Sequence, residues 1–261
     1  NKMNAINDSM PKEIENAIQL ADSDPDIHVI ILSGAGKAFC AGYDLEHYSK
    51  ESETNNVIQG MPWDPMKDYQ FMWKNTQHFM SLWRAMKPVI CKIHGYAVAG
   101  GSDIALCSDM TVMADDAEIG YMPARVWGTP TTAMWVQRLG PERAKRMLFT
   151  GDRIKGKEAA EIGLVLKSVP LKELDEYVEN LAARMASVPV NQLAMQKMII
   201  NQAMESSGLM EMQRMSTLFD GISRHSPEGL EFKRRVDEVG WKKAVAERDE
   251  GTYDWTRQKK I

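Results

Sequence analysis

Three short apolar segments, each followed by polar or glycine-containing residues, constrain the fold of this chain most. They are IHVIILSG at residues 27–34, VICKIHG at 89–95 and MTVMA at 110–114. Continuous apolar runs of this length are typical of strands buried on both faces of a parallel sheet. Apolar residues at helical spacing predict helices over residues 8–21 and about 69–86. The alternation of strand and helix predicts an α/β architecture with parallel pairing.

The composition excludes several classes of protein. The 261 residues suit one large domain, or one domain with an appendage. A net charge of −4 lacks the basic excess of a nucleic-acid-binding protein, and no apolar run approaches the roughly 20 residues that span a bilayer. Cys40, Cys91 and Cys107 show no C-x-x-C spacing, which disfavours a disulfide framework or a zinc site. We therefore expect a cytoplasmic protein that binds no nucleic acid, no membrane and no metal.

The segment GAGKAF at 34–39 follows a predicted strand but fits neither common phosphate-binding motif. Ala38 stands where a P-loop needs serine or threonine after its lysine, and Phe39 stands where the dinucleotide motif needs glycine. The sequence also has no G-x-S-x-G segment, so the nucleophile of most α/β-hydrolases is missing. These motifs give no support to nucleotide binding or to serine-nucleophile chemistry.

Two other glycine-containing loops follow predicted strands, CAGYDL at 40–45 and AGGSDI at 99–104. If a helix begins at Ser102 or Asp103, the N–H group of Gly100 lies at its positive end. A second N–H group from the first loop would complete an oxyanion hole, a pair of donors for developing negative charge. The alternative is that Gly100 and Gly101 make a tight turn and that Asp103 caps the helix. The residues alone leave both interpretations open.

Three blocks of sequence together resemble one known family. They are GAGKAFCAGYDL at 34–45, KPVICKIHGYAVAGGSDIALCSD at 87–109 and RLGPERAKRMLFTGDRIKGKEAAEIGLV at 138–165. This set is similar to the enoyl-CoA hydratase/isomerase superfamily, the crotonases. The resemblance implies a spiral of repeated ββα units in residues 1–188 and a helical trimerisation region in 189–261, assembled as a homotrimer or a hexamer. It also implies a strand hairpin before NKMNAIN, so we expect an N-terminal segment to precede Asn1.

The resemblance assigns roles to the two loops. The backbone N–H groups of Tyr43 and Gly100 would bind the thioester oxygen of an acyl-CoA and stabilise an enolate. The residues expected to cradle the CoA portion are Ala38, Ala41, Asp44 and Leu45. Arg125 and Trp127 would line the acyl pocket, with an internal salt bridge as the alternative role for Arg125. Coenzyme A enters as part of the substrate, and no bound cofactor is expected.

The sequence departs from the family pattern where hydratases carry two glutamates. Asp103 stands at the first position, and its side chain is one methylene shorter; a misplacement of about 1 Å can cost roughly 10²-fold in rate. The second position falls in IGYMPAR at 119–125, which contains no acid. We therefore expect an atypical member that lacks the usual glutamate pair, with Asp103 as a candidate catalytic residue.

The leading hypothesis is an acyl-CoA-processing lyase of the enoyl-CoA hydratase type, with a role in fatty acid metabolism. A second hypothesis is a CoA-independent β-diketone hydrolase that acts by retro-Claisen cleavage, since some family members do not use CoA. A third is a non-catalytic protein that keeps the fold and binds acyl-CoA or RNA. RNA binding would depend steeply on salt concentration, whereas a lyase would turn over thioesters.

Overall fold

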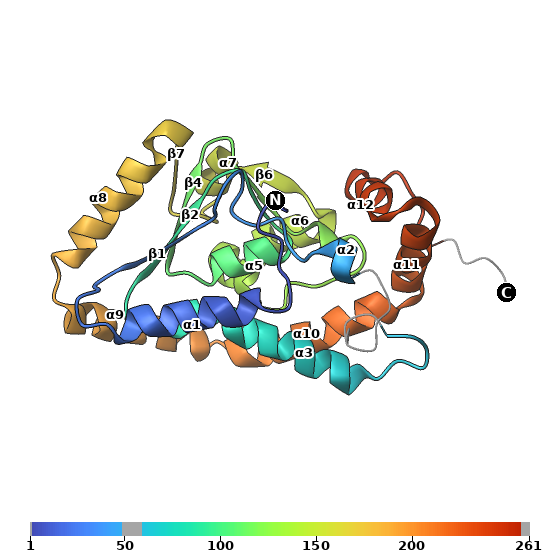
Figure 1. Ribbon diagram of the computed structural model, residues 1–261, viewed down its shortest axis with the longest axis horizontal. Helices are drawn as coiled ribbons and strands as arrows, with labels where there is room; N and C mark the ends of the chain where they lie inside the picture. Colours follow the sequence, from blue (N-terminus) through green and yellow to red (C-terminus); the bar gives the residue numbers. More distant parts are fainter. Residues whose placement is uncertain (1, 49–58, 257–261) are drawn as a thin grey trace.

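Two β-sheets and a set of surrounding helices make up the computed structural model of the chain, which describes residues 2–48 and 59–256 (Figure 1). The first sheet is fully parallel and has the order β1-β2-β4-β7. Its strands are β1 (Ile30–Ser33), β2 (Val89–Ile93), β4 (Met110–Ala114) and β7 (Lys167–Val169). The second sheet has the order β3-β5-β6, with strands β3 (Tyr96–Val98), β5 (Glu118–Gly120) and β6 (Arg153–Lys155).

The chain alternates between the two sheets. Strand β2 belongs to the first sheet and β3 to the second, and helix α5 (Gly100–Leu106) follows them. Strands β4 and β5 repeat this order, and helix α6 (Met134–Thr150) follows. Each repeat therefore adds one strand to each sheet, in parallel with its predecessor, as a spiral of ββα units requires. Strand β6 is the exception in direction, since it pairs antiparallel with β5.

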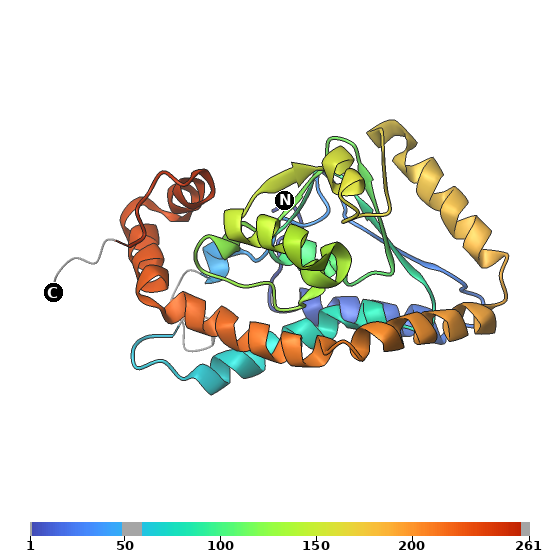
Figure 2. The same ribbon diagram turned by 180° about the vertical axis from the view of Figure 1, so that it is seen from behind.

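Helices enclose these sheets and continue to the C-terminal end of the described chain. Near the N-terminus they are α1 (Met10–Ser23), α2 (Leu45–Tyr48), α3 (Pro65–Phe79) and α4 (Ser81–Arg84). After α6 come α7 (Gly156–Glu161), α8 (Leu174–Ala186), α9 (Val190–Glu205), α10 (Leu209–His225), α11 (Pro227–Val239) and α12 (Trp241–Glu250), with short 3₁₀ turns η1 (Met122–Ala124) and η2 (Leu171–Glu173). Helices α9 and α10 run beneath the sheets beside α1 and α3 (Figures 1 and 2).

The predicted α/β architecture and its parallel pairing are confirmed. All three predicted strands form, as β1, β2 and β4, and the predicted helices correspond to α1 and to α3 with α4. The expectation that residues 27–34 form a strand buried on both faces is wrong. Strand β1 lies at the edge of its sheet, and Ile31 keeps 40% of its surface exposed. Residues 50–68 are polar and contain Pro62 and Pro65, which predicts a long loop. Residues 50–58 lie outside the described ranges, residues 59–64 form neither helix nor strand, and α3 begins at Pro65.

The Met-rich segment at 191–220 forms α9 and α10, which carry a row of exposed apolar side chains. These are Met195, Met198, Ile199, Ile200, Met215, Leu218, Phe219 and Ile222. On the inner side of α9, the ammonium group of Lys197 is buried and donates to Asp109 Oδ2 at 2.7 Å and to the carbonyl of Leu82. Trimerisation through residues 189–261, and the domain boundary at 188, stay predictions. No helix in the described ranges is long and apolar enough to cross a membrane.

Candidate active site

A cavity of about 630 Å³ opens between the strand-and-loop core and helices α10 and α12. Its lining residues come from the N-terminal segment at 2–5, the loop at 41–48, the turn at 98–100, the segment at 121–127, and helices α3, α10 and α12. Two packed clusters meet at this cavity. Tyr43 and Tyr121 belong to the main hydrophobic core, whereas Met72 and Trp127 belong to a smaller cluster with α11 and α12. The cavity therefore lies where the main hydrophobic core meets this smaller cluster.

Tyr43 presents its backbone N–H group on the cavity side of the first loop. The neighbouring groups are bound to Ile6, because Ile6 N–H donates to Gly42 O at 2.8 Å and Asp44 N–H donates to Ile6 O at 3.0 Å. In a parallel bridge the residue between these two bonds directs its own N–H to the opposite side. Within residues 2–48 and 59–256, the Tyr43 N–H donates to no other group of the protein.

Gly100 is the first residue of α5, and its N–H group likewise donates to no group in the described ranges. Ala99 precedes it with φ 51° and ψ −126°, a conformation that L-residues adopt rarely and at a cost of about 1–3 kcal/mol. This turn makes the helix begin two residues before Ser102, earlier than predicted. Tyr43 and Gly100 both line the cavity, and they supply two backbone donors to one space.

Six of the nine predicted site residues line the cavity, namely Ala41, Tyr43, Asp44, Leu45, Gly100 and Trp127. The other three lie elsewhere. Ala38 is fully buried, and its carbonyl accepts a hydrogen bond from Asn4. Arg125 donates to the carbonyl of Thr150 at 2.6 Å and contacts Gly151, away from the cavity. It does not line this cavity, and among residues 2–48 and 59–256 it forms no salt bridge of the kind given as its alternative role.

Asp103 lies behind the cavity wall instead of in it. Its side chain is 4% exposed, and Oδ1 accepts a hydrogen bond from Thr132 Oγ1 at 2.7 Å. Burial raises the pKa of Asp103 to about 8, so the carboxyl is protonated at neutral pH. The sequence left open that Asp103 caps α5, but its side chain makes no capping hydrogen bond to that helix.

Asp44 and Glu46 lie at the cavity mouth, where Lys2 bridges them. The ammonium nitrogen of Lys2 lies 2.8 Å from Asp44 Oδ2 and 3.1 Å from Glu46 Oε2. Lys242 and Arg248, from α12, are further cationic side chains of the cavity lining. Arg248 is paired with Asp249, as Lys2 is with Asp44 and Glu46, so the mouth carries charges of both signs; within the described residues, Lys242 has no carboxylate partner.

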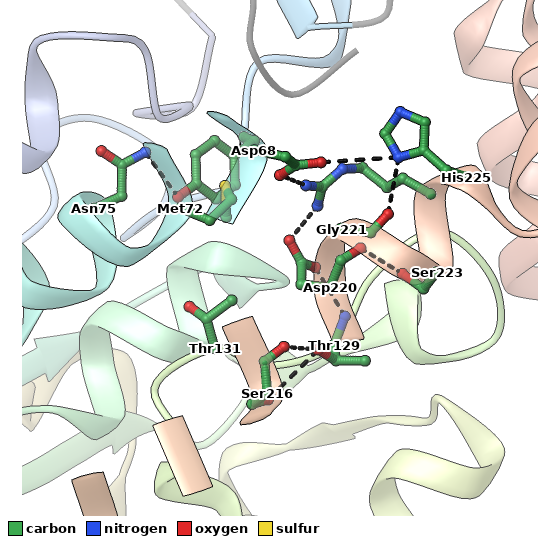
Figure 3. Close-up of polar contacts among 12 residues, drawn as sticks. Asp68, Met72, Asn75, Thr129, Thr131, Ser216, Asp220, Gly221, Ser223 and His225 are labelled. Carbon is green, nitrogen blue, oxygen red and sulfur yellow. Dashed lines mark hydrogen bonds and ion pairs between the residues drawn. The ribbon is translucent and has the colours of Figure 1, made fainter. Parts of the chain in front are cut away.

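A buried charged cluster on the inner wall was missed by the sequence analysis. The guanidinium group of Arg224 on α10 is paired with Asp220 on the same helix and with Asp68 on α3. Figure 3 shows Asp68, Asp220 and His225 converging between these helices. Asp220 and Arg224 line the cavity, and Asp68 lies behind them. The only sequence signal was the i,i+4 spacing of Asp220 and Arg224 in a helix that otherwise looks like core or interface.

Burial sets the protonation of this cluster and of the tyrosines beside it. Burial raises the pKa of Asp68 to about 6, although the charge of Arg224 opposes the shift. Burial, together with the charges of Asp103 and Asp220, raises the pKa of Tyr121 well above its ordinary value. Tyr121 therefore keeps its proton, which it donates to the carbonyl of Thr129 at 2.7 Å.

Comparison with known proteins decides the family. The sequence matches the family Enoyl-CoA hydratase/isomerase over residues 1–236. The chain belongs to the enoyl-CoA hydratase/isomerase family. It is 48% identical to a solved enoyl-CoA hydratase from Mycobacterium smegmatis, with a TM-score of 0.89, covering 96% of this chain and 87% of that one. The crotonase fold predicted from the sequence is thereby confirmed.

Two further family members show the range of similarity. A crotonyl-CoA hydratase from Syntrophomonas wolfei is 30% identical, over 78% of this chain and 75% of that protein. A solved enoyl-CoA hydratase/isomerase from Xanthobacter autotrophicus is 26% identical, with a TM-score of 0.86, covering 97% of this chain and 91% of that one. Family membership implies action on CoA thioesters.

Proposed function

We propose that this protein is an acyl-CoA-processing lyase of the enoyl-CoA hydratase type. The observation that carries the proposal is that Tyr43 and Gly100 line one cavity, each with a backbone N–H group that no other group of the described protein uses. Two such donors hold the oxygen of a thioester and stabilise it most when that oxygen becomes the anion of an enolate. The hydratases among its relatives support the same chemistry.

The CoA portion would lie across the mouth of the cavity. Ala41, Asp44 and Leu45 form one side of the mouth, and Lys242 and Arg248 of α12 form the other. The Lys242 ammonium group suits the phosphate groups of CoA, whereas Arg248 is already paired with Asp249. The acyl group would then point inward, towards Trp127 and the wall formed by Tyr121 and Asp220. Location in the cytoplasm and assembly as a homotrimer or hexamer belong to the proposal.

Asp103 would act in this scheme as a buried neutral carboxyl, in place of the catalytic role predicted for it. It does not line the cavity, and its hydrogen bond from Thr132 joins α5 to the segment before α6. A direct proton transfer needs a heavy-atom distance of about 2.6–3.2 Å from the group that reacts. Position, more than protonation, therefore argues against direct catalysis by Asp103.

Turnover of a panel of enoyl-CoA, 3-hydroxyacyl-CoA and β-ketoacyl-CoA thioesters tests the proposal, with products identified by mass spectrometry. We expect turnover of at least one class and competition by free CoA. The variant Gly100→Pro removes one proposed donor and should lower kcat/KM by about 10²–10³-fold. Circular dichroism and free-CoA binding show whether that variant keeps its fold.

Two outcomes would contradict the proposal. Cleavage of a free β-diketone without competition by CoA would favour the retro-Claisen hydrolase. Salt-dependent RNA binding without thioester turnover would favour the non-catalytic alternative.

A further inference from the structure

The innermost cavity wall places two oxygen atoms close to one another. A Cβ atom at Gly128 would lie 3.3 Å from Asp220 Oδ1 and 3.3 Å from the hydroxyl oxygen of Tyr121. Asp220 and Tyr121 both line the cavity, and they come from α10 and from the segment after β5. Two oxygens from cavity-lining residues thus lie near one another beside Gly128, which is buried and does not itself line the cavity.

Both oxygens are hydrogen-bond acceptors. The Tyr121 hydroxyl donates its proton to the Thr129 carbonyl, so only its lone pairs remain for a ligand. Asp220 Oδ1 accepts from the Thr129 N–H at 2.9 Å, and Oδ2 accepts from Arg224. An ionised carboxylate has about four acceptor positions, so two hydrogen bonds do not exhaust it. A ligand group that is a hydrogen-bond donor therefore fits this wall, whereas a group that only accepts hydrogen bonds does not.

The charge of the wall excludes an anion. The positive charge of Arg224 is shared between Asp220 and Asp68, which lie on opposite sides of it. With both carboxyls ionised, the three side chains sum to one negative charge. An acyl carboxylate brought here would lose its hydration and meet like charge, which is costly in a buried site. The remaining class of ligand is a neutral donor.

We propose that this wall is a subsite for an acyl group that carries a hydroxyl. Asp220 would accept the hydrogen bond of that hydroxyl, with the Tyr121 oxygen as a neighbouring acceptor. The subsite rests on the proposed function, because it assumes that the acyl portion of a CoA thioester enters the cavity. Asp220 is then a specificity-determining residue, held in place by Arg224 and by the Thr129 N–H.

Binding of unreactive saturated thioesters tests the subsite apart from any turnover. Calorimetry would compare acyl-CoA thioesters of four to eight carbons that end in a methyl, a hydroxyl or a carboxyl group. At one or more chain lengths we expect the hydroxyl-ended thioester to bind about 10–100-fold more tightly than its methyl-ended counterpart, the range of a hydrogen bond to a charged acceptor. The carboxyl-ended thioester should bind most weakly.

Three variants assign the preference to the two oxygens. Asp220→Asn replaces the charged acceptor with a neutral amide, and Tyr121→Phe removes the other oxygen; each should reduce the hydroxyl preference. Gly128→Ala places a methyl group against both oxygens and should abolish the preference even if Asp220→Asn fails to fold. Asp175→Asn is the control, since Asp175 is an exposed carboxylate paired with Lys92, and it should leave the preference unchanged.

The outcomes separate the two proposals. Equal binding of hydroxyl-ended and methyl-ended thioesters at every length, or tightest binding of the carboxyl-ended series, overturns the subsite and leaves the acyl-CoA function standing. Absence of binding by every thioester overturns both. A hydroxyl preference that Gly128→Ala leaves intact would show that other residues make the selection.

Discussion

The carbonyl oxygen of Cys40 lies only 2.3 Å from the point that a Cβ atom would occupy at Gly101. The two loops that carry the proposed oxyanion donors are therefore packed backbone against backbone. Cys40 also pairs with the strand before the second loop, because Val98 N–H donates to Cys40 O at 3.1 Å. The relative position of Tyr43 and Gly100 depends on this contact.

Replacement of Gly101 by alanine should disrupt that contact. A methyl group cannot fit 2.3 Å from a carbonyl oxygen, so one loop must move. Overpacking of this kind typically costs about 1–3 kcal/mol of stability. A displacement of about 1 Å between the donors would also lower kcat/KM by roughly 10²-fold. Denaturant unfolding and thioester turnover measure the two effects. Gly60→Ala is the matched control, because no heavy atom of the described residues lies within 4 Å of its Cβ position.

The strained backbone at Ala99 leads to the opposite expectation for stability. Its φ of 51° costs about 1–3 kcal/mol for an L-residue and little for glycine. Glycine also makes the unfolded chain more flexible, which removes about 0.4–1 kcal/mol. Ala99→Gly should therefore stabilise the fold by about 1 kcal/mol and raise Tm by a few degrees. A lower Tm for Ala99→Gly would mean that the turn is unstrained.

The buried carboxyl of Asp103 should make stability depend on pH. Its pKa is about 8 in the folded state, against an ordinary value of 3.8. Between these values the folded state holds a proton that the unfolded state has released, so stability falls as pH rises. From pH 6 to pH 8 this loss amounts to about 2 kcal/mol. Asp68 titrates near pH 6, so it contributes mainly below this window.

Asp103→Asn should flatten that part of the pH profile. The amide does not titrate, and its oxygen can still accept the hydrogen bond from Thr132. Denaturant unfolding of both proteins at pH 6, 7 and 8 gives the comparison. Parallel profiles for the two proteins would show that Asp103 is ionised throughout.

Lys197 gives a fourth prediction, about the attachment of α9. Its ammonium group is 8% exposed and donates to Asp109, Leu82 O and Lys87 O. Lys197→Met leaves the Asp109 carboxylate without its partner in a low-dielectric site and should cost about 3–5 kcal/mol. The exposed Lys172→Met is the control and should change stability little. Equal losses of stability in the two variants would show that the buried pair of Lys197 and Asp109 contributes no more than an exposed lysine does.

The strands and their parallel pairing could be predicted because continuous apolar runs reflect burial directly. The prediction of burial on both faces failed for β1, whose sequence is as apolar as that of β2 although 40% of the Ile31 surface is exposed. Apolar composition does not say whether a strand lies at the edge of a sheet. The start of α5 was also misplaced, because Ala99 adopts a backbone conformation that glycine usually occupies.

The two loops at 40–45 and 99–104 could be singled out from the sequence because each contains glycine and follows a predicted strand, and the family resemblance then assigned the proposed oxyanion donors to them. The charged wall was not, because Asp68 and Asp220 lie far apart in the sequence and meet only through the packing of α3 against α10. Arg125 was misplaced for a similar reason. Its sequence position next to the pocket segment does not reveal that its side chain reaches Thr150.

Asp220, the charged acceptor of the proposed subsite, belongs to α10, whereas Tyr43 lies in the loop before α2 and Gly100 begins α5. The proposed chemistry and the proposed choice of acyl group thus depend on separate stretches of the chain. If both proposals hold, substitutions in α10 change which thioester is accepted without moving the proposed oxyanion donors. Such a division gives the protein a route to new substrates in evolution, through changes in one helix while the reaction centre is inherited intact.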